Sequence, residues 1–152
     1  MFQKFFTSLY EAILGHATPA SLIPTYRQAI FPSVGLFAVF VAGLGLALVF
    51  YLLLNRVLVT SFFQTKHWLL MLGAAAVVSG IFAFTQARSV VFQVMSEQDL
   101  AISSLDQSAY NRYALAFMFT SALVGACFFV LWSFAVKWAS TSARTTPLRW
   151  LS

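Results

Sequence analysis

The sequence predicts an all-α integral membrane protein with three transmembrane helices and an N-terminal amphipathic helix in the membrane interface. Three observations lead to this prediction. Of the 152 residues 61% are apolar and only 9% are charged, whereas soluble domains are about 45–50% apolar and about 25% charged. Three long windows contain no charged residue, and the first fourteen residues place apolar side chains along one helical stripe. A water-soluble globule and a disordered chain are therefore excluded.

The uncharged windows give the number of spans. They cover residues 28–55, 67–87 and 113–136. A helix needs about 20 apolar residues to cross a hydrocarbon core of about 30 Å, so each window is long enough. Apolar residues run continuously instead of alternating, which favours helices over barrel strands. We expect one membrane domain, 28–138, with spans at about 30–54, 67–87 and 113–137.

Residues 1–27 form the first predicted segment, an amphipathic helix followed by a proline-containing linker. The apolar stripe consists of Phe2, Phe5, Phe6, Leu9 and Ile13. Such a stripe suits a helix lying in the interface, and packing on the protein's own spans or on a partner is an equal alternative. A cleaved signal peptide is disfavoured, because Thr7, Ser8 and Glu11 interrupt the apolar run. Pro32 is predicted to begin the first span, since a proline suits the first helical turn.

The remaining segments are the connection 88–112 and the C-terminal tail 139–152. Apolar residues after Ala87 extend the second helix beyond the membrane, and Asp106 or Ser108 is expected to cap the third helix. The connection is therefore predicted to be a largely helical stalk. Its acidic residues lack the pattern of a calcium-binding loop and are interpreted as a solvated face.

Basic residues predict the orientation. With three spans, the N-terminus and the 88–112 connection share one side, which carries four basic residues and all four acidic residues. The other side carries five basic residues without an acid: Arg56, Lys66, Lys137, Arg144 and Arg149. The positive-inside rule therefore predicts a bacterial inner-membrane protein with the N-terminus outside and the C-terminus inside, and with anionic lipid on the basic side.

The sequence offers no catalytic chemistry. Glycine-rich phosphate loops, nucleophile elbows, HExxH and CxxC are all missing from it. Cys127 stands alone in the third span, and His16 and His67 are predicted on opposite sides of the membrane. No Asp, Glu, Lys, Arg or His lies near a predicted midplane, which disfavours a coupled transporter. We expect no enzyme activity, cofactor, metal site or nucleic-acid binding.

Small residues give the strongest positive pattern. They recur at spacings of three and four in the first two spans, a heptad pattern that allows close helix approach and predicts a left-handed crossing near about +20°. The predicted helix-packing seam consists of Gly35, Ala38, Ala42, Gly45, Gly73, Ala76, Gly80, Ala83 and Ala87. The predicted interfacial anchors are aromatic, namely Phe2, Phe5, Phe6, Trp68, Trp138 and Trp150.

These features predict a non-enzymatic accessory or structural subunit of a larger membrane complex. Its partners would be other integral membrane subunits and the lipid bilayer. One alternative is a homo-oligomeric pore, for which Ser79, Gln86, Thr120 and Ser133 are the candidate lining. A second alternative is a small carrier, although the sequence shows no substrate site for it.

Overall fold

The computed structural model describes residues 1–17, 20–53, 65–98 and 104–137, and this part of the chain contains helices but no strand. Three helices are long and apolar enough to cross a membrane: Ile23–Leu52, Lys66–Val90 and Gln107–Val136. The predicted all-α architecture and the predicted number of candidate spans are therefore confirmed.

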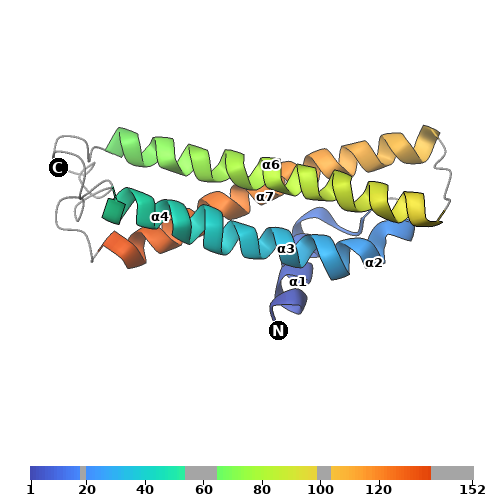
Figure 1. Ribbon diagram of the computed structural model, residues 1–152, viewed down its shortest axis with the longest axis horizontal. Coiled ribbons are helices and arrows are strands. Elements are labelled where there is room, and N and C mark those ends of the chain that lie inside the picture. The colour runs from blue at the N-terminus through green and yellow to red at the C-terminus, as the bar shows by residue number, and fades with distance from the viewer. Residues whose placement is uncertain (18–19, 54–64, 99–103, 138–152) are drawn as a thin grey trace.

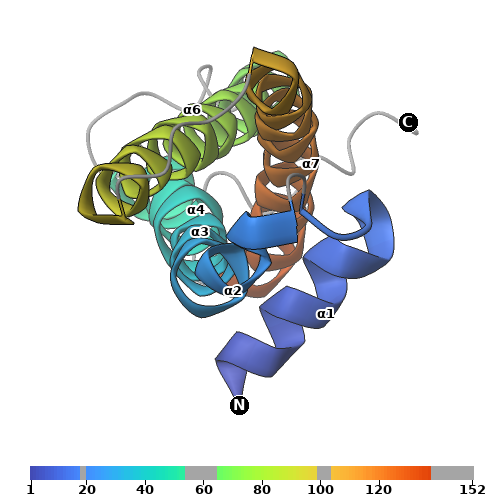
Figure 2. The same cartoon turned by 90° about the vertical axis from the view of Figure 1, so that its right-hand side faces the viewer.

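Three long helices run side by side, and a short fourth helix lies across them. The short helix is α1, Phe2–Leu14. The first long helix, here called the composite helix, covers 23–53, and α6 (Thr65–Gln98) and α7 (Ser104–Val136) follow it. Figure 1 shows the long helices along the length of the molecule, and Figure 2 shows α1 on the outside of the bundle, beside α2 and α7.

The composite helix alternates between α-helical and π-helical turns. Its α-helical parts are α2 (Ile23–Thr25), α3 (Phe31–Leu36) and α4 (Leu46–Leu48). Its π-helical parts are Tyr26–Ile30, Phe37–Gly45 and Val49–Leu53, and a 3₁₀ turn, Ala20–Leu22, precedes it. Wider turns change which face each residue presents, so the heptad spacing of this segment does not translate into one straight stripe.

Pro32 does not begin the first span, so this prediction was wrong. Pro24 occupies the first turn, and the helix passes through Pro32 without ending. The π-helical turn before Pro32 makes this possible, because the Phe31 N–H donates to the Tyr26 carbonyl. In that register the Arg27 carbonyl faces Pro32, which has no N–H to donate. One backbone carbonyl of this turn is thereby left for a donor from another element.

The second and third long helices extend beyond the lengths needed for a membrane. With 34 residues in α6 and 33 in α7, each is about 50 Å long, against about 30 Å of hydrocarbon. The predicted continuation of the second helix past Ala87 is confirmed, since α6 ends at Gln98. The predicted cap was wrong, because α7 begins at Ser104 and includes both Asp106 and Ser108.

The described core has two clusters, one toward each end of the bundle. The larger cluster joins α1 to the long helices and includes Tyr10, Tyr26, Phe31 and Phe117. The smaller cluster includes Phe50, Tyr51, Trp68 and Phe129. Because α1 contributes only to the larger cluster, the two ends of the bundle differ in structure.

Candidate functional site

Helices α6 and α7 meet along rows of buried residues spaced four apart. On α6 the row is Ala75, Ser79, Ala83 and Ala87, all 0% exposed. On α7, Gly125 receives the Ser79 side chain, and Phe129 and Ser133 contact Trp68 near the start of α6. The buried α7 residues Tyr113, Phe117 and Ser121 contact Tyr26 of the composite helix and Tyr10 of α1 instead. Because Gly125 has no side chain, the two backbones approach closely where Ser79 lies on it.

Rows spaced by four predict a different crossing from a heptad. When rows of four interdigitate, helices cross with the opposite hand, near about −40 to −50°, instead of about +20°. In Figure 1 the nearer helix, α6, descends to the right while α7 rises to the right, which is a right-handed crossing. The left-handed crossing expected from the heptad is therefore replaced by a right-handed one. Its physical reason is that Ala75 and Ser79, not Gly73 and Ala76, face α7.

Two hydrogen bonds join α6 to α7 inside this seam, whereas the buried Ser79 hydroxyl has no hydrogen-bond partner among the described residues. The indole N–H of Trp68 donates to Ser133 Oγ over 3.2 Å, and the Tyr110 hydroxyl donates to the Ala87 carbonyl over 2.8 Å. The Thr120 hydroxyl donates to the Ala116 carbonyl of its own helix over 3.0 Å. These bonds satisfy groups that a hydrocarbon surrounding could not.

The residues of the predicted seam divide into three groups. Ala38, Ala42, Gly80, Ala83 and Ala87 are buried in the bundle. Gly35 is also buried, but the ring that lies on it belongs to Phe6 of α1. Ala76 and Gly45 are half-buried, and Gly73 is exposed, with no atom within 4 Å of the position that a Cβ would take. The structure thus brings most of the seam together and leaves Gly73 on the outer surface of α6.

The predicted anchors also divide. Phe2 and Phe5 are exposed on α1, with exposed fractions of 63% and 54%. Phe6 and Trp68 are buried inside the protein, because Gly35 leaves room for the Phe6 ring and Ser133 accepts from the Trp68 indole. Trp138 and Trp150 lie outside the described residues.

Helix α1 is fixed to the bundle by Tyr10, which is not among the predicted interfacial anchors. The Tyr10 ring is fully buried, stacks on Phe31 at 5.3 Å and meets Phe117 edge to face at 5.1 Å. The Ser121 hydroxyl donates to the Tyr10 oxygen over 3.4 Å. Burial raises the pKa of Tyr10 to about 12, although this bond opposes the shift. The residue therefore docks α1 in its neutral form.

The polar edge of α1 is fastened to the carbonyl that Pro32 leaves free. The Gln3 amide and the Thr7 hydroxyl both donate to the Arg27 carbonyl over 3.4 Å. One turn further, the Arg27 guanidinium binds Glu11 through two nitrogens, the second over 3.1 Å. The i, i+4 spacing of Gln3, Thr7 and Glu11 places all three on one edge of the helix. The opposite edge carries Phe2, Phe5, Leu9 and Ile13.

We predict that acid weakens the docking of α1. The hydrogen bond from Arg27 holds the pKa of Glu11 below its ordinary value of 4.5, with His16 3.7 Å away on the same carboxylate. A depressed pKa stabilises the folded state above pH 4.5, and this contribution is lost as the pH falls through the lower folded-state value. Since the pair is partly solvated, the effect is small.

The measurement is the distance between spin labels at Lys4→Cys and Arg112→Cys in a Cys127→Ala background. Its distribution is expected to broaden on acidification. Glu11→Gln serves as the control and should show the broader distribution at every pH. If the distance distribution stayed unchanged in both proteins, the ion pair between Arg27 and Glu11 would not contribute to the docking of α1.

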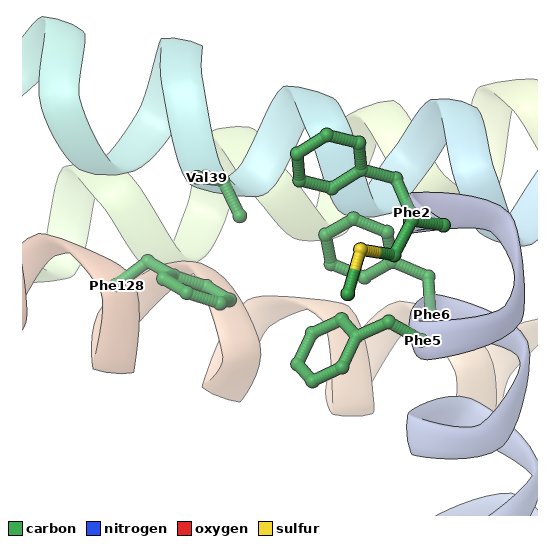
Figure 3. A pocket seen from close by; sticks show the side chains of 6 residues that line it. Phe2, Phe5, Phe6, Val39 and Phe128 are labelled. Carbon is green, nitrogen blue, oxygen red and sulfur yellow. The ribbon is translucent and has the colours of Figure 1, made fainter.

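Two apolar hollows lie between α1 and the long helices. The first, of about 350 Å³, is bounded by Phe2, Phe5 and Phe6 of α1, Val39 of the composite helix and Phe128 of α7. Figure 3 shows these side chains facing one another across it. The second, of about 300 Å³, lies between Phe5, Leu9 and Ile13 and the α7 residues Leu123, Cys127 and Phe128. Phe5 and Phe128 border both hollows, so the two are neighbours.

Side chains with chemical reactivity are scattered. Within 1–17, 20–53, 65–98 and 104–137, no three His, Cys, Asp or Glu side chains lie close enough to hold a metal ion. Cys127 is an exposed free thiol at the edge of the second hollow. Two surfaces of the described residues can therefore bind another molecule. One is the outer face of α6, which carries Leu70, Gly73, Val77 and Ile81, and the other is formed by the hollows beside α1.

No protein-family model, curated protein or solved structure matches this chain.

Proposed function

We propose that the chain is a non-enzymatic subunit of a larger membrane assembly and that it binds an integral membrane partner through the outer face of α6. The observation that carries this proposal is the low coverage of α6 within the chain. Over its most apolar window, 28% of residues are buried, against 39% in each of the other two candidate spans.

The composition of this face suits helix packing. Leu70, Val77 and Ile81 are 68%, 59% and 57% exposed, and Gly73 lies in the same row with open space around it. A glycine permits close approach of a second backbone, which is how helices associate in lipid. Val77 and Ile81 are β-branched and stiff, so they lose little freedom when a partner packs on them.

The outer face of α7 differs and suits lipid contact. Its exposed side chains are bulky, namely Leu115, Phe119, Leu123, Leu131 and Phe134. Such a row keeps a second backbone at a distance. We therefore assign the partner to α6 and lipid to α7.

No observation favours the homo-oligomeric pore. Three of its four candidate lining residues, Ser79, Thr120 and Ser133, are buried inside the single chain, and Gln86 is half-buried. A pore would need such polar groups on an outer face, where they could meet water in the centre of a ring. Both hollows beside α1 are apolar, so neither offers a polar substrate site for the carrier alternative.

Photo-crosslinking in native membranes tests the α6 surface. A photoreactive residue at Val77 is expected to give one protein adduct of defined mass, whereas the same residue at Leu123 on α7 should give lipid adducts. Adding Gly73→Leu is expected to reduce the protein adduct at least tenfold without changing the fold, because the leucine fills the space that a partner backbone needs. Equal protein adducts from Val77 and Leu123, or no effect of Gly73→Leu, would contradict the proposal.

We also propose the N-outside, C-inside orientation, which the excess of basic residues near Lys66 and Lys137 supports. In a Cys127→Ala background, Asp99→Cys is expected to react with a membrane-impermeant maleimide added to intact cells. Thr145→Cys is expected to react only after the cells are lysed. The reverse pattern would invert the orientation.

A further inference from the structure

The two hollows beside α1 lie at the depth of lipid acyl chains. Arg27, Arg88 and Arg112 are neighbours at one end of the bundle, since Tyr26 packs on Tyr113 and Tyr110 binds the Ala87 carbonyl. Thr120 lines the second hollow, and Phe128 borders both. Along α7 they lie eight and sixteen residues from Arg112, toward the other end of the bundle. At 1.5 Å per residue, the hollows lie about 12 to 24 Å from the level of these arginines, which is within a hydrocarbon core of about 30 Å.

The charges above the hollows are complementary to a phosphate. Arg88 and Arg112 are exposed at this end, and Arg27 is paired with Glu11. Lys4 is also exposed and follows Gln3, whose amide donates to the Arg27 carbonyl. The acidic residues of the two long helices stand farther out: Glu97 is nine residues beyond Arg88, and Asp106 is six residues before Arg112. They therefore lie about 9 to 14 Å farther along the helices. Next to the apolar zone, basic side chains outnumber acidic ones.

The size and chemistry of the hollows favour a flexible chain over a protein helix. At about 350 and 300 Å³, they fall at the lower end of ligand cavities, roughly 300–1,000 Å³. One turn of a helix about 10 Å wide occupies about 420 Å³ and needs an opening of its full width. An irregular peptide would leave backbone N–H and C=O groups without partners on these apolar walls. Each of the two neighbouring hollows can take a segment of one acyl chain, and a lipid with two acyl chains can fill both.

We propose that α1 and α7 form a binding site for one glycerophospholipid. Its acyl chains occupy the two hollows on either side of Phe5, and its phosphate lies at the level of Lys4 and Arg112. The apolar edge of α1 is thereby covered by a bound lipid, while the polar edge stays fastened to Arg27. This site is distinct from the partner surface on α6, so either can fail without the other.

Native mass spectrometry of the purified chain tests the site. The protein is released from nanodiscs of palmitoyl-oleoyl phosphatidylcholine and phosphatidylglycerol in equal parts, and in a second sample from detergent containing oleic acid. One phospholipid per chain is expected to survive mild activation. The filling variant Val39→Phe/Cys127→Phe is expected to retain it at least tenfold less often. Val41→Phe/Leu131→Phe places the same two rings on exposed positions of the same two helices and should behave like the wild type.

Equal retention by the filling and control variants would overturn the proposal, as would binding of oleic acid without phospholipid. If the filling variant does not fold, the test is made on the wild-type chain alone. The chain is exchanged exhaustively into lipid-free detergent, and the phosphorus that remains bound to it is measured. About one phosphorus per chain is expected, and less than about one tenth would overturn the site.

Discussion

Gly125→Leu is expected to separate α6 from α7 and to destabilise the three-helix bundle. A Cβ at Gly125 would overlap the Ser79 side chain and would lie 3.1 Å from the Ala75 carbonyl oxygen. The obstacle therefore includes backbone, which cannot rotate away. Overpacking a core typically costs about 1–3 kcal/mol, and we expect the upper end of that range. Reversible unfolding in SDS, followed by tryptophan fluorescence, measures the loss.

The matched control is Gly73→Leu on α6. Its side chain enters open space, so its effect on unfolding should stay within about 0.5 kcal/mol, as is usual for surface substitutions. Gly80→Leu should fall between the two, because its Cβ would lie 3.2 Å from the Met118 carbonyl oxygen. Equal stability of the three variants would refute a close-packed α6–α7 seam.

Tyr10→Ala is expected to release α1 while leaving the three long helices folded. The ring is fully buried between Phe31 and Phe117, and truncating a buried aromatic side chain costs about 3–5 kcal/mol. Helix α1 ends at Gly15, which has φ 75°, and is thus a separate element from the long helices. The substitution should therefore weaken the docking of α1 and not the packing of the long helices. Amide hydrogen exchange of residues 2–14 should rise sharply, and that of α6 and α7 should not.

Tyr10→Phe separates the ring from its hydroxyl. This variant keeps both ring contacts and loses only the long bond with Ser121, so it should cost about 1 kcal/mol or less. If Tyr10→Phe released α1 as fully as Tyr10→Ala, the aromatic contacts would not be what holds it.

The spans were predictable because one physical property decides them. A membrane excludes charge, so the uncharged windows alone gave the number of long helices and their approximate ends. The amphipathic helix α1 was predictable for the same reason, because apolar side chains gather on one edge of it and polar side chains on the other. Both predictions depend on the solvent and not on which side chains touch.

The details of packing were not predictable, because they depend on backbone geometry. Pro32 was assigned to a first turn, but a preceding π-helical turn accommodates it and frees the Arg27 carbonyl for Gln3 and Thr7. Small residues do recur at heptad spacing through Gly73 and Ala76. The residues of α6 that lie against Gly125 of α7 are nevertheless Ala75 and Ser79, in a neighbouring row. A sequence gives the spacing of small residues but not which of two neighbouring rows turns inward.

The docking of α1 shows the same limit. Phe2, Phe5 and Phe6 form one aromatic cluster in the sequence, but only Phe6 lies over a glycine of another helix. Tyr10 lies outside the predicted apolar stripe, although its separation of four from Phe6 places both on one face of α1. That spacing was the signal that could have identified the docking face.

The measurement that tests the central claim most directly is purification of the tagged chain from its native membrane in a mild detergent, followed by mass spectrometry of everything retained. The wild type should carry at least one integral membrane protein in fixed stoichiometry. Gly73→Leu should lose that protein while keeping the same unfolding behaviour. A monodisperse chain without a stoichiometric partner, or catalytic turnover by the isolated chain, would contradict the account.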